Sequence, residues 1–561
     1  MIKKVFSLLH KDISGLHEAA YILAFSAFLS QILALLRDRM LAHSFGAGEI
    51  LDIYYASFRV PDFIFISIAS LVSLAVLVPF LSQEIDKKYI RRFMNEIFSV
   101  FFILITVVSV VVFFFLPKII PLLFRGFSAD ALQEVIVLAR IMLLSPILLG
   151  ISNFCASIIQ VNKKFFIYAL SPILYNIGII LGILLFYPIW GLKGLALGVV
   201  LGAFFHLGIQ IPSIARLKFL PRLTLPQRWG AIKKMMALSI PRTLALSLNS
   251  FAFLVLVAVA SSLGEGAISV FIFAFALQSI PLSIIGVSYS TASFPILSKL
   301  FRDNQKEFFC HISISAKHII FWTISASALF IVLRAQIVRT ILGTGEFSWT
   351  DTRLTAACLA IFAVSITAQS LILLFVKAYY ASGRTKRPVF INIFSSICVI
   401  GSVFLFKWLF VYFPIVRAKI GEALRVSDVA NIDVLILPLG FSAGALLNVL
   451  LLYIFFKKDF RPVGMSLRKS FLQVLGASVV MGVATYFSLE IWNNVFNMNT
   501  FIGIFLQGFL AGITGIAVLI IVLKLVGNAE INEILNYLKK HPSIPEGQRP
   551  VPELPDIRPL N

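Results

Sequence analysis

The chain has 561 residues, of which 59% are hydrophobic and only 13% are charged, and its formal net charge is +22. A soluble domain is about 45–50% apolar and about 25% charged, so this composition excludes an ordinary soluble protein and indicates a membrane protein. The basic residues form short clusters between apolar segments, as membrane topology requires, so we expect membrane lipids as neighbours and no nucleic-acid partner.

The apolar segments are each long enough to cross a bilayer, which takes about 20 residues. They predict an all-α, polytopic membrane protein with fourteen transmembrane helices, arranged as two sets of six followed by a pair. The first set lies near residues 19–42, 53–82, 95–117, 131–160, 165–187 and 194–215. The second set and the final pair lie near residues 235–262, 267–298, 311–333, 354–381, 388–413, 433–456, 470–490 and 501–525.

These segments divide the chain into six regions. Residues 1–18 form a basic amphipathic lead-in that we expect on the membrane surface, and residues 528–561 form a cytoplasmic tail that is largely disordered because it is rich in proline. The regions between them are an N-terminal six-helix lobe (19–215), a basic cytoplasmic linker (216–234), a C-terminal six-helix lobe (235–456) and the two last helices (457–527).

The two lobes repeat the same landmarks 216 residues apart. Pro79-Phe80-Leu81-Ser82 recurs as Pro295-Ile296-Leu297-Ser298, and Pro172 with Asn176 recurs as Pro388 with Asn392. An even number of helices in each repeat gives both repeats the same orientation, so the repeats are parallel. Duplicated multi-helix halves are typical of secondary transporters, in which the substrate path lies between the repeats. The sequence therefore predicts a transporter.

The Lys and Arg clusters alternate along the chain and predict its orientation. They follow every second helix, in the loops around Lys87, Lys163, Lys218, Lys386 and Lys457, and they are absent around Gly46, Gly264 and Asn493. Because Lys and Arg remain on the cytoplasmic side, we expect the first group of loops inside and the second outside. Both termini are then cytoplasmic, in a multi-pass protein of the plasma membrane.

Ionised side chains within membrane helices are costly, so each is a candidate functional residue. The first helix carries Arg37, Asp38 and Arg39, and the second carries Arg59 and Asp62 beside Pro61, which we expect to interrupt that helix. The seventh begins with Ser239-Ile240-Pro241-Arg242, and the tenth contains Lys377. Cations outnumber acids in these helices, which suits an anion such as a phosphate or diphosphate.

Simpler interpretations remain open for three of these residues. Arg39 lies near a helix end and is expected to extend its side chain to the membrane interface. Arg59 and Asp62 are three residues apart and could neutralise each other. Lys377 could reach the cytoplasmic headgroups.

No catalytic motif accompanies these charges. The sequence has no glycine-rich phosphate loop, no His/Cys cluster and no nucleophile elbow, so we expect no enzyme activity, no cofactor and no metal site. Transport would then be driven by the membrane potential or an ion gradient.

The motifs in the first two helices resemble a known family. The segment Leu36-Arg37-Asp38-Arg39-Met40-Leu41-Ala42-His43-Ser44-Phe45-Gly46-Ala47-Gly48, followed by Asp52 and by Phe58-Arg59-Val60-Pro61-Asp62-Phe63, is similar to the opening of the MurJ/MviN lipid II flippases. That family belongs to the multidrug/oligosaccharidyl-lipid/polysaccharide exporter superfamily. The resemblance implies that a lipid-linked cell-wall precursor, built on undecaprenyl diphosphate, moves from the inner to the outer leaflet by alternating access.

The resemblance also implies roles for single residues. Arg37, Arg59 and Arg242 would bind the substrate, and Asp38, Asp52 and Asp62 would pair with cations as the lobes close. Relatives carry further cavity arginines where this chain has Gln31, Phe65 and Ala276, and an acid where it has Ser70. In relatives a groove at the last two helices holds the lipid tail, and the apolar stretch 501–525 is compatible with that role.

Three alternatives follow from the same residues. A flippase of the same superfamily that moves an O-antigen or capsule lipid intermediate would have the same helices and phosphate chemistry. A multidrug cation antiporter would stop near twelve helices and carry acids deep in its helices, which this chain lacks. A non-transporting scaffold would recruit cell-wall synthases or division proteins through its loops and tail.

Overall fold

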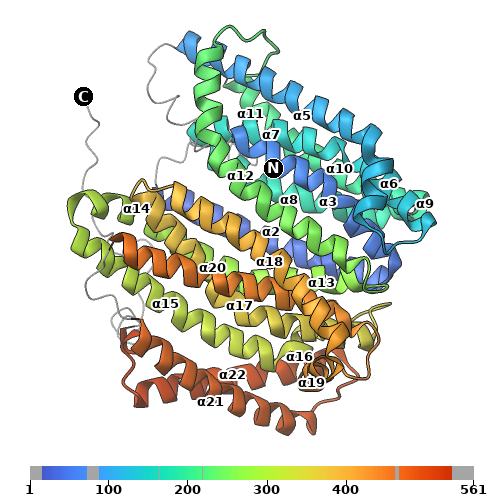
Figure 1. Ribbon diagram of the computed structural model, residues 1–561, viewed down its shortest axis with the longest axis vertical. Coiled ribbons are helices and arrows are strands. Elements are labelled where there is room, and N and C mark those ends of the chain that lie inside the picture. The colour runs from blue at the N-terminus through green and yellow to red at the C-terminus, as the bar shows by residue number, and fades with distance from the viewer. Residues whose placement is uncertain (1–15, 73–86, 163, 218, 461–466, 534–561) are drawn as a thin grey trace, which may run out of the picture.

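The computed structural model describes residues 16–72, 87–162, 164–217, 219–460 and 467–533, and every regular element within them is a helix. The predicted all-α class is confirmed. Figure 1 shows the helices stacked in three groups, with the N-terminal lobe at the top, the C-terminal lobe in the middle and the last two helices at the bottom. The predicted lead-in falls almost wholly outside the described residues, and so does the tail after residue 533.

The N-terminal lobe contains the first six predicted segments. Its elements are α2 (Leu16–Phe45), α3 (Glu49–Ala69), η1 (Ser70–Val72), α5 (Lys87–Leu123), α6 (Ala129–Met142), α7 (Leu144–Val161), α8 (Phe165–Leu181), η2 (Gly182–Phe186), α9 (Tyr187–Trp190), α10 (Leu192–Gly208) and α11 (Ile211–Arg216). Pro61 lies inside α3 without ending it, so the predicted interruption of that helix is wrong.

The C-terminal lobe contains the next six. Its elements are α12 (Trp229–Ala260), α13 (Ala267–Pro281), η3 (Leu282–Val287), α14 (Ser288–Asp303), α15 (Gln305–Val332), α16 (Arg334–Leu342), α17 (Trp349–Ala381), α18 (Lys386–Tyr412), α19 (Pro414–Leu424), η4 (Ile432–Leu435) and α20 (Ile436–Phe460). The helix that contains Arg242 begins at Trp229 and continues through Pro241, so it does not begin at Ser239 as the sequence suggested.

The last two helices, α21 (Arg468–Asn493) and α22 (Phe501–Leu525), pack against each other, and α21 packs against α15. They therefore cover the side of the C-terminal lobe that faces away from the N-terminal lobe, as Figure 1 shows.

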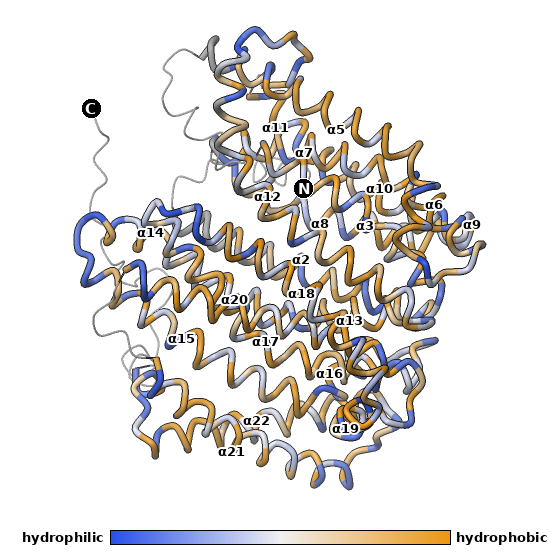
Figure 2. The backbone as a smooth tube through the Cα atoms, in the orientation of Figure 1, coloured by the Kyte–Doolittle hydropathy of each residue, from blue (hydrophilic) through white to orange (hydrophobic). Residues whose placement is uncertain are grey.

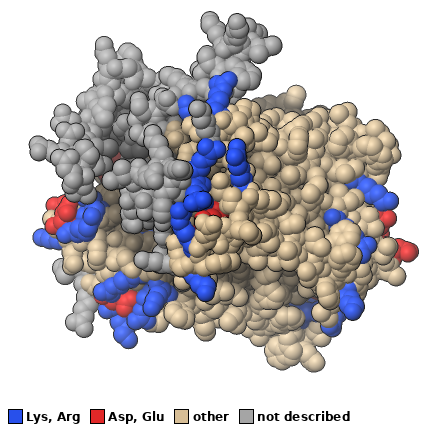
Figure 3. Space-filling view, turned by 90° about the horizontal axis from the view of Figure 1, so that it is seen from above, with Lys and Arg blue, Asp and Glu red and all other residues tan. Residues whose placement is uncertain are grey.

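Twelve helices within the described residues are long and apolar enough to cross a membrane, and they coincide with the third to fourteenth predicted segments. The first two segments correspond to α2 and α3, which carry the charged candidate residues. Figure 2 shows hydrophobic residues along the helices and hydrophilic residues mainly near their ends, and Figure 3 shows a broad uncharged surface between two charged margins. This distribution is that of a multi-pass membrane protein. The twelve spans together with α2 and α3 are compatible with fourteen transmembrane helices.

Glycines bring α8 and α10 into backbone contact. A Cβ atom added to Gly178 would lie 2.3 Å from Cα of Gly202, and one added to Gly182 would lie 2.5 Å from Cα of Gly198. Small residues four apart allow this close approach in membrane helices, where packing replaces the hydrophobic effect as the driving force. Because α8 also packs along α2, this contact fixes the position of α8 side chains that face α2.

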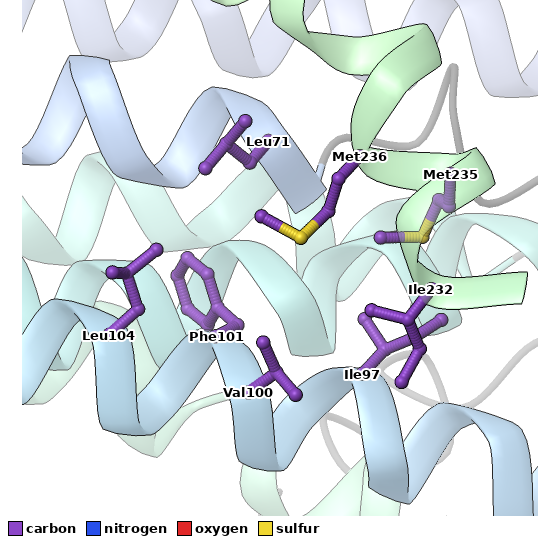
Figure 4. Close-up of a pocket in the computed structure, with 8 residues that line it drawn as sticks. All are labelled: Leu71, Ile97, Val100, Phe101, Leu104, Ile232, Met235 and Met236. Atoms are coloured by element: carbon purple, nitrogen blue, oxygen red, sulfur yellow. The ribbon is translucent and has the colours of Figure 1, made fainter. Parts of the chain in front are cut away.

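The helix α12 connects the two lobes. Its first turns pack on α5 and on the end of η1 around a small apolar cavity of about 20 Å³, lined by Leu71, Phe101, Met235 and Met236 among others (Figure 4). Further along, α12 packs against α18 of the C-terminal lobe. Methionine side chains adapt to changes in packing, so this contact suits a helix that must accommodate relative movement of the lobes.

The orientation can be tested with cysteines at exposed sites near the helix ends, in a background that lacks the native cysteines. We predict that a cysteine in place of Asn493 reacts with an impermeant thiol reagent in intact cells, whereas cysteines in place of Lys386 and Lys457 react only after the membrane is permeabilised. All three residues are exposed, so burial does not limit the reaction. Labelling at Lys386 in intact cells would contradict the predicted orientation.

Candidate functional site

Arg37 lies in a network of hydrogen bonds between α2 and α8. Its Nε and Nη2 donate to Oδ1 of Asp38 at 2.9 and 2.8 Å, and its Nη1 donates to Oδ1 of Asn176 at 3.1 Å. The Asn176 amide in turn donates to Oγ of Ser30 at 3.3 Å. Ser30 lies two turns before Arg37 on the same face of α2. The guanidinium is thus held in one orientation by a carboxylate and an amide, as a charge within the membrane requires.

Asn176 is the partner of Arg37 that was not predicted as a site residue, although it is one of the repeated landmarks of the two lobes. It lies four residues after Pro172, and its side-chain amide donates to the Pro172 carbonyl at 3.1 Å, one helical turn before it. The repeated Pro-x-x-x-Asn motif was therefore the available signal.

Arg59 is held less tightly than Arg37. Its Nε donates to the Tyr55 carbonyl at 3.1 Å, and its Nη2 lies 3.6 Å from Oδ2 of Asp62. At that distance the ion pair is longer than a hydrogen bond, and the Asp62 side chain is 47% exposed while that of Arg59 is 15% exposed. The predicted i,i+3 pair exists, but it leaves most of the guanidinium's donors available.

The structure brings these charged residues together around Tyr55. This tyrosine interacts electrostatically with Arg37, Asp38 and Arg59, and within the described residues its buried hydroxyl has no hydrogen-bond partner. Four of the six candidate residues, Arg37, Asp38, Arg59 and Asp62, therefore belong to one cluster on α2 and α3, which we call the charged cluster.

A cavity of about 650 Å³ lies beside the charged cluster in the C-terminal lobe, and we call it the lobe cavity. The ring of Phe253, which lines it, lies 5.2 Å from the Arg59 guanidinium carbon. Its polar lining residues are Asn249, Gln369, Lys377, Tyr380, Asn392, Ser395, Ser396 and Asn448. Lys377 is the one charged side chain among its lining residues, so the cavity combines one cation with several amides and hydroxyls.

Lys377 therefore lines the lobe cavity, with its Nζ 5.0 Å from the centre of the Phe294 ring. The open interpretation, in which it reaches the cytoplasmic headgroups, stays a prediction. The helical periodicity of the sequence could not indicate that Lys377 lines a cavity, because it does not show which face of α17 packs against other helices.

The repeated asparagine of the C-terminal lobe also has a polar role. Asn392 accepts a hydrogen bond from Nδ2 of Asn448 at 3.1 Å, and Ser396, one turn later, donates to Oδ1 of Asn249 at 2.7 Å. In both lobes, then, the helix with the Pro-x-x-x-Asn motif holds a polar side chain of the lobe's first helix, α2 or α12. The duplicated helices thus keep a polar contact with the first helix of their lobe, although Ser396 and not Asn392 makes it in the C-terminal lobe.

Asp52 joins the two lobes at one end of the molecule. Its Oδ2 accepts from the Gly266 N–H at 2.8 Å, and its Oδ1 accepts from the N–H and the hydroxyl of Ser269 at 2.8 and 2.6 Å. These donors lie at the beginning of α13, where unpaired N–H groups and the helix dipole favour a carboxylate. Among the described residues Asp52 thus caps a helix of the other lobe, and its predicted pairing with a cation stays a prediction.

The turns at the same end are packed against each other. The Glu346 N–H donates to the His43 carbonyl at 3.0 Å, and the Glu49 N–H donates to Oε1 of Glu265 at 3.2 Å. Gly46 has a φ of 61°, and a Cβ atom there would lie 2.7 Å from the Glu346 carbonyl oxygen. The lobes are thus closed at the end that the predicted orientation assigns to the outside.

Arg39 also contributes to this closed end. Its Nη1 donates to the carbonyls of Thr340 and Ile341 at 2.5 and 3.0 Å, and its guanidinium lies 5.2 Å from the centre of the Phe501 ring. The position of Arg39 at the membrane interface stays a prediction, and the structure adds that its guanidinium binds the end of α16. The last carbonyls of α16 lack partners within that helix, and they provide acceptors that no local pattern in the sequence indicates.

A long apolar groove lies on the far side of the C-terminal lobe, with a volume of about 900 Å³. Its walls come from α15, α17, α20 and α21, and we call it the α21 groove. The resemblance implied a groove at the last two helices, and α21 does line this one, but none of the lining residues lies between 501 and 525. The helix α22 packs against α21 and α16.

The model of the MurJ lipid II flippase family matches residues 41–507, well over half of the chain. The chain belongs to this family. Among its relatives, the probable lipid II flippase MurJ of Buchnera aphidicola (subspecies Schizaphis graminum) is 27% identical over 376 residues, covering 65% of this chain and 73% of the relative. The lipid II flippase MurJ of Burkholderia cenocepacia is 25% identical over 467 residues, covering 81% of this chain and 86% of the relative.

Solved structures show the same fold. A lipid II flippase MurJ in an inward closed conformation superposes with a TM-score of 0.71 at 23% identity, covering 89% of this chain and 98% of the other. A multidrug resistance MATE family transporter of the MOP superfamily, in an inward-facing conformation, gives a TM-score of 0.61 at 15% identity, covering 77% and 94%. The arrangement of the helices is therefore shared with both structures, and the MurJ family match extends through α21 into the beginning of α22.

Arg242 is the one candidate whose contacts stay open. It lies within α12, but its side chain is outside the described residues. Its predicted role in binding the substrate stays a prediction.

We predict that Asp52→Ala loosens the closed end of this flippase. Hydrogen bonds to a charged group contribute about 1.5–3 kcal/mol each, so losing those at α13 should shift the equilibrium toward an open end about tenfold or more. The rate at which a cysteine in place of Ala47 reacts with a thiol reagent should rise accordingly. Asp130→Ala is the control, since Asp130 is an exposed acid on α6. Equal rates in both variants would contradict this role for Asp52.

Proposed function

We propose that the protein translocates lipid II, the undecaprenyl-diphosphate-linked peptidoglycan precursor, from the inner to the outer leaflet of the bacterial plasma membrane by alternating access. Membership of the MurJ family carries this proposal. The family is one of lipid transporters, in keeping with a protein that catalyses no reaction. The charged cluster, the lobe cavity and the α21 groove support the proposal, because they offer surroundings for an anionic headgroup, a polar saccharide and an apolar chain.

The diphosphate is the part of the substrate that the charged cluster would bind. Arg59 retains free donors, and Arg37 is held in one orientation by Asp38 and Asn176. Arginine holds phosphate oxygens with two parallel hydrogen bonds, so two arginines on neighbouring helices suit a diphosphate. Asp38 and Asp62 would keep the arginines neutralised while the substrate is absent, which limits the cost of the empty site.

The lobe cavity would hold the polar remainder of the headgroup. Asn249, Gln369 and Asn392 present amides, which donate to and accept from sugar hydroxyls and peptide groups. Its volume of about 650 Å³ lies within the range of ligand pockets, about 300–1,000 Å³. A larger headgroup would require the lobes to separate further, as they do when a transporter opens toward one side.

The conformational cycle would use the contacts at the closed end. With the termini in the cytoplasm, the turns around Gly46 and Gly264 close the outer side, so this structure corresponds to a state without an outward opening. Outward opening would break the hydrogen bonds of Asp52 and Arg39 with the other lobe. A cationic site that moves within the membrane senses the potential, at about 2.3 kcal/mol per charge per 100 mV.

Two alternatives differ from this proposal in substrate or in class. A flippase for an O-antigen or capsule lipid intermediate would share the diphosphate site, so only its saccharide contacts in the lobe cavity would differ. A scaffold that recruits cell-wall synthases or division proteins would need its surface but no charged cluster. Depletion of the protein, followed by measurement of lipid II in each leaflet, separates the proposal from both alternatives: inner-leaflet accumulation supports the proposal, and unchanged distribution contradicts it.

We predict that Arg37→Ala and Arg59→Ala each abolish growth in a strain depleted of its lipid II flippase. Removing one partner of a desolvated charge pair costs about 2–5 kcal/mol, which is more than tenfold in binding. Arg59→Lys should retain partial activity, because the charge remains while the two-pronged geometry is lost. Arg302→Ala is the control, since Arg302 is an exposed arginine at the end of α14. Membrane abundance is measured for every variant, and full activity of the Arg37→Ala, Arg59→Ala double variant would contradict the site.

Lys377 gives a separate prediction for the lobe cavity. We expect Lys377→Met to reduce complementation severely, because it removes the one charge among the residues that line the cavity. Lys377→Arg should preserve more activity than Lys377→Met, since the charge is kept. If the two variants grew equally well at equal abundance, the lobe cavity would not contribute a cation to transport.

A further inference from the structure

A second cavity continues the α21 groove toward the closed end of the molecule. It has a volume of about 610 Å³ and lies between α16, the beginning of α17, the end of α19 and the last turns of α21. Ile331, Val332 and Tyr486 line both this cavity and the groove, so the two spaces adjoin each other. We call it the arginine pocket because Arg334, Arg353 and Arg425 line it.

The arginine pocket carries excess positive charge. Glu490 is the one acid among its lining residues, against the three arginines. Arg353 is engaged by Asp428, which it meets with two hydrogen bonds of 2.8 and 2.5 Å. This arginine holds the pKa of the Asp428 carboxyl below its usual range, so the pair stays ionised.

Arg334 and Arg425 differ from Arg353, because within the described chain no carboxylate lies at ion-pair distance from either. Nη2 of Arg334 donates to the Leu424 carbonyl at 3.0 Å, and Nη2 of Arg425 lies 3.4 Å from the Tyr486 hydroxyl. Burial lowers the pKa of Arg334, and the neighbouring charge of Arg425 lowers it further. A half-buried cation and an exposed cation thus repel each other, and an anion between them would relieve that repulsion.

The backbone at Arg425 also shows that this side chain has been positioned. Arg425 has a φ of 59° at the end of α19, in the left-handed region where glycine is the usual residue. An arginine therefore occupies a backbone conformation that residues other than glycine seldom adopt. Its guanidinium contacts Tyr486, which also lines the groove. Such outliers concentrate at functional sites.

The length of the groove indicates what kind of lipid fits. Its lining residues on α21 extend from Phe471 to Phe487 along one helix face, which is about 24 Å at 1.5 Å per residue. A leaflet is about 15 Å deep, half of the ~30 Å hydrocarbon core. The groove therefore exceeds the depth that an ordinary phospholipid chain occupies in one leaflet, and it suits a longer hydrocarbon.

We propose that the arginine pocket binds the phosphate end of a long-chain polyprenyl phosphate lipid whose chain lies in the α21 groove. The proposal rests on the proposed function and deepens it by adding a second phosphate site, outside the charged cluster and at the outer membrane surface. Arginine forks match phosphate oxygens, and the apolar groove extends from the same pocket. A lipid that has been released to the outer leaflet would be held there by Arg334 and Arg425 before it diffuses away.

The experiment uses the purified full-length protein and measures bound lipid by native mass spectrometry, with undecaprenyl phosphate as the probe. We expect Arg334→Gln with Arg425→Gln to weaken its binding about tenfold or more, since two charge-assisted contacts are lost. Arg417→Gln is the matched control, because Arg417 lies on the same α19 but pairs with Asp433. The titrations are repeated in the Arg37→Ala background, so that the charged cluster does not supply the binding.

A second variant tests the groove without changing any charge. A Cβ at Gly482 would meet Val332 at 3.5 Å, an ordinary contact, so Gly482→Leu should fold while it obstructs the groove. It should weaken undecaprenyl phosphate binding, and phosphatidylglycerol should bind the wild-type protein less tightly than undecaprenyl phosphate. Unchanged binding in the double arginine variant, or equal binding of the two lipids, would overturn the proposal.

Failure of the site and failure of the proposed function give different results. If the protein flips lipid II while the arginine pocket variants bind undecaprenyl phosphate normally, only the second phosphate site is wrong. If those variants lose binding while the wild-type protein flips no lipid II, the lipid site stands and the proposed function fails.

Discussion

The cost of keeping an ionised side chain inside a membrane determines how this protein is built. A lone arginine in the hydrocarbon core is expensive, so Arg37 is held by Asp38 on its own helix and by Asn176 on α8. That arrangement requires α2 and α8 to remain in register, and the glycine contact between α8 and α10 fixes where α8 lies. The packing of small residues in one helix pair thus supports a charge in another.

The same constraint explains the contacts between the lobes. Asp52 finds its donors at the beginning of α13, and Arg39 finds its acceptors at the end of α16, so neither charge is left unpaired while the outer end is closed. Opening that end exposes both groups to water, which can replace the lost partners. In alternating access, the contacts that close one end must be strong enough to keep the lobes together there and weak enough to break when that end opens. Helix termini meet that need, because they offer partial charges in place of full ones.

Much of the fold could be predicted from hydropathy, because a membrane helix is recorded locally in about 20 consecutive residues. The duplication gave the lobes, and the arginines and acids of α2 and α3 were recognisable as a candidate site. The partners of Asp52 and Arg39 were not, since they begin 214 and 301 residues away and are, apart from the Ser269 hydroxyl, backbone groups without a sequence signature. The walls of the α21 groove were missed for the same reason: packing between α15, α17, α20 and α21 is set by the tertiary fold. Lys377 was ambiguous because the sequence does not record which face of α17 meets the lobe cavity.

Translocation in a defined membrane tests the central claim most directly. The purified protein is reconstituted in liposomes with lipid II in the inner leaflet, and an enzyme added outside converts each molecule that arrives there. The account predicts conversion with the wild-type protein and with Arg302→Ala, and only the background rate of protein-free liposomes with Arg37→Ala. Background conversion with correctly inserted wild-type protein, or wild-type conversion with Arg37→Ala, would contradict it.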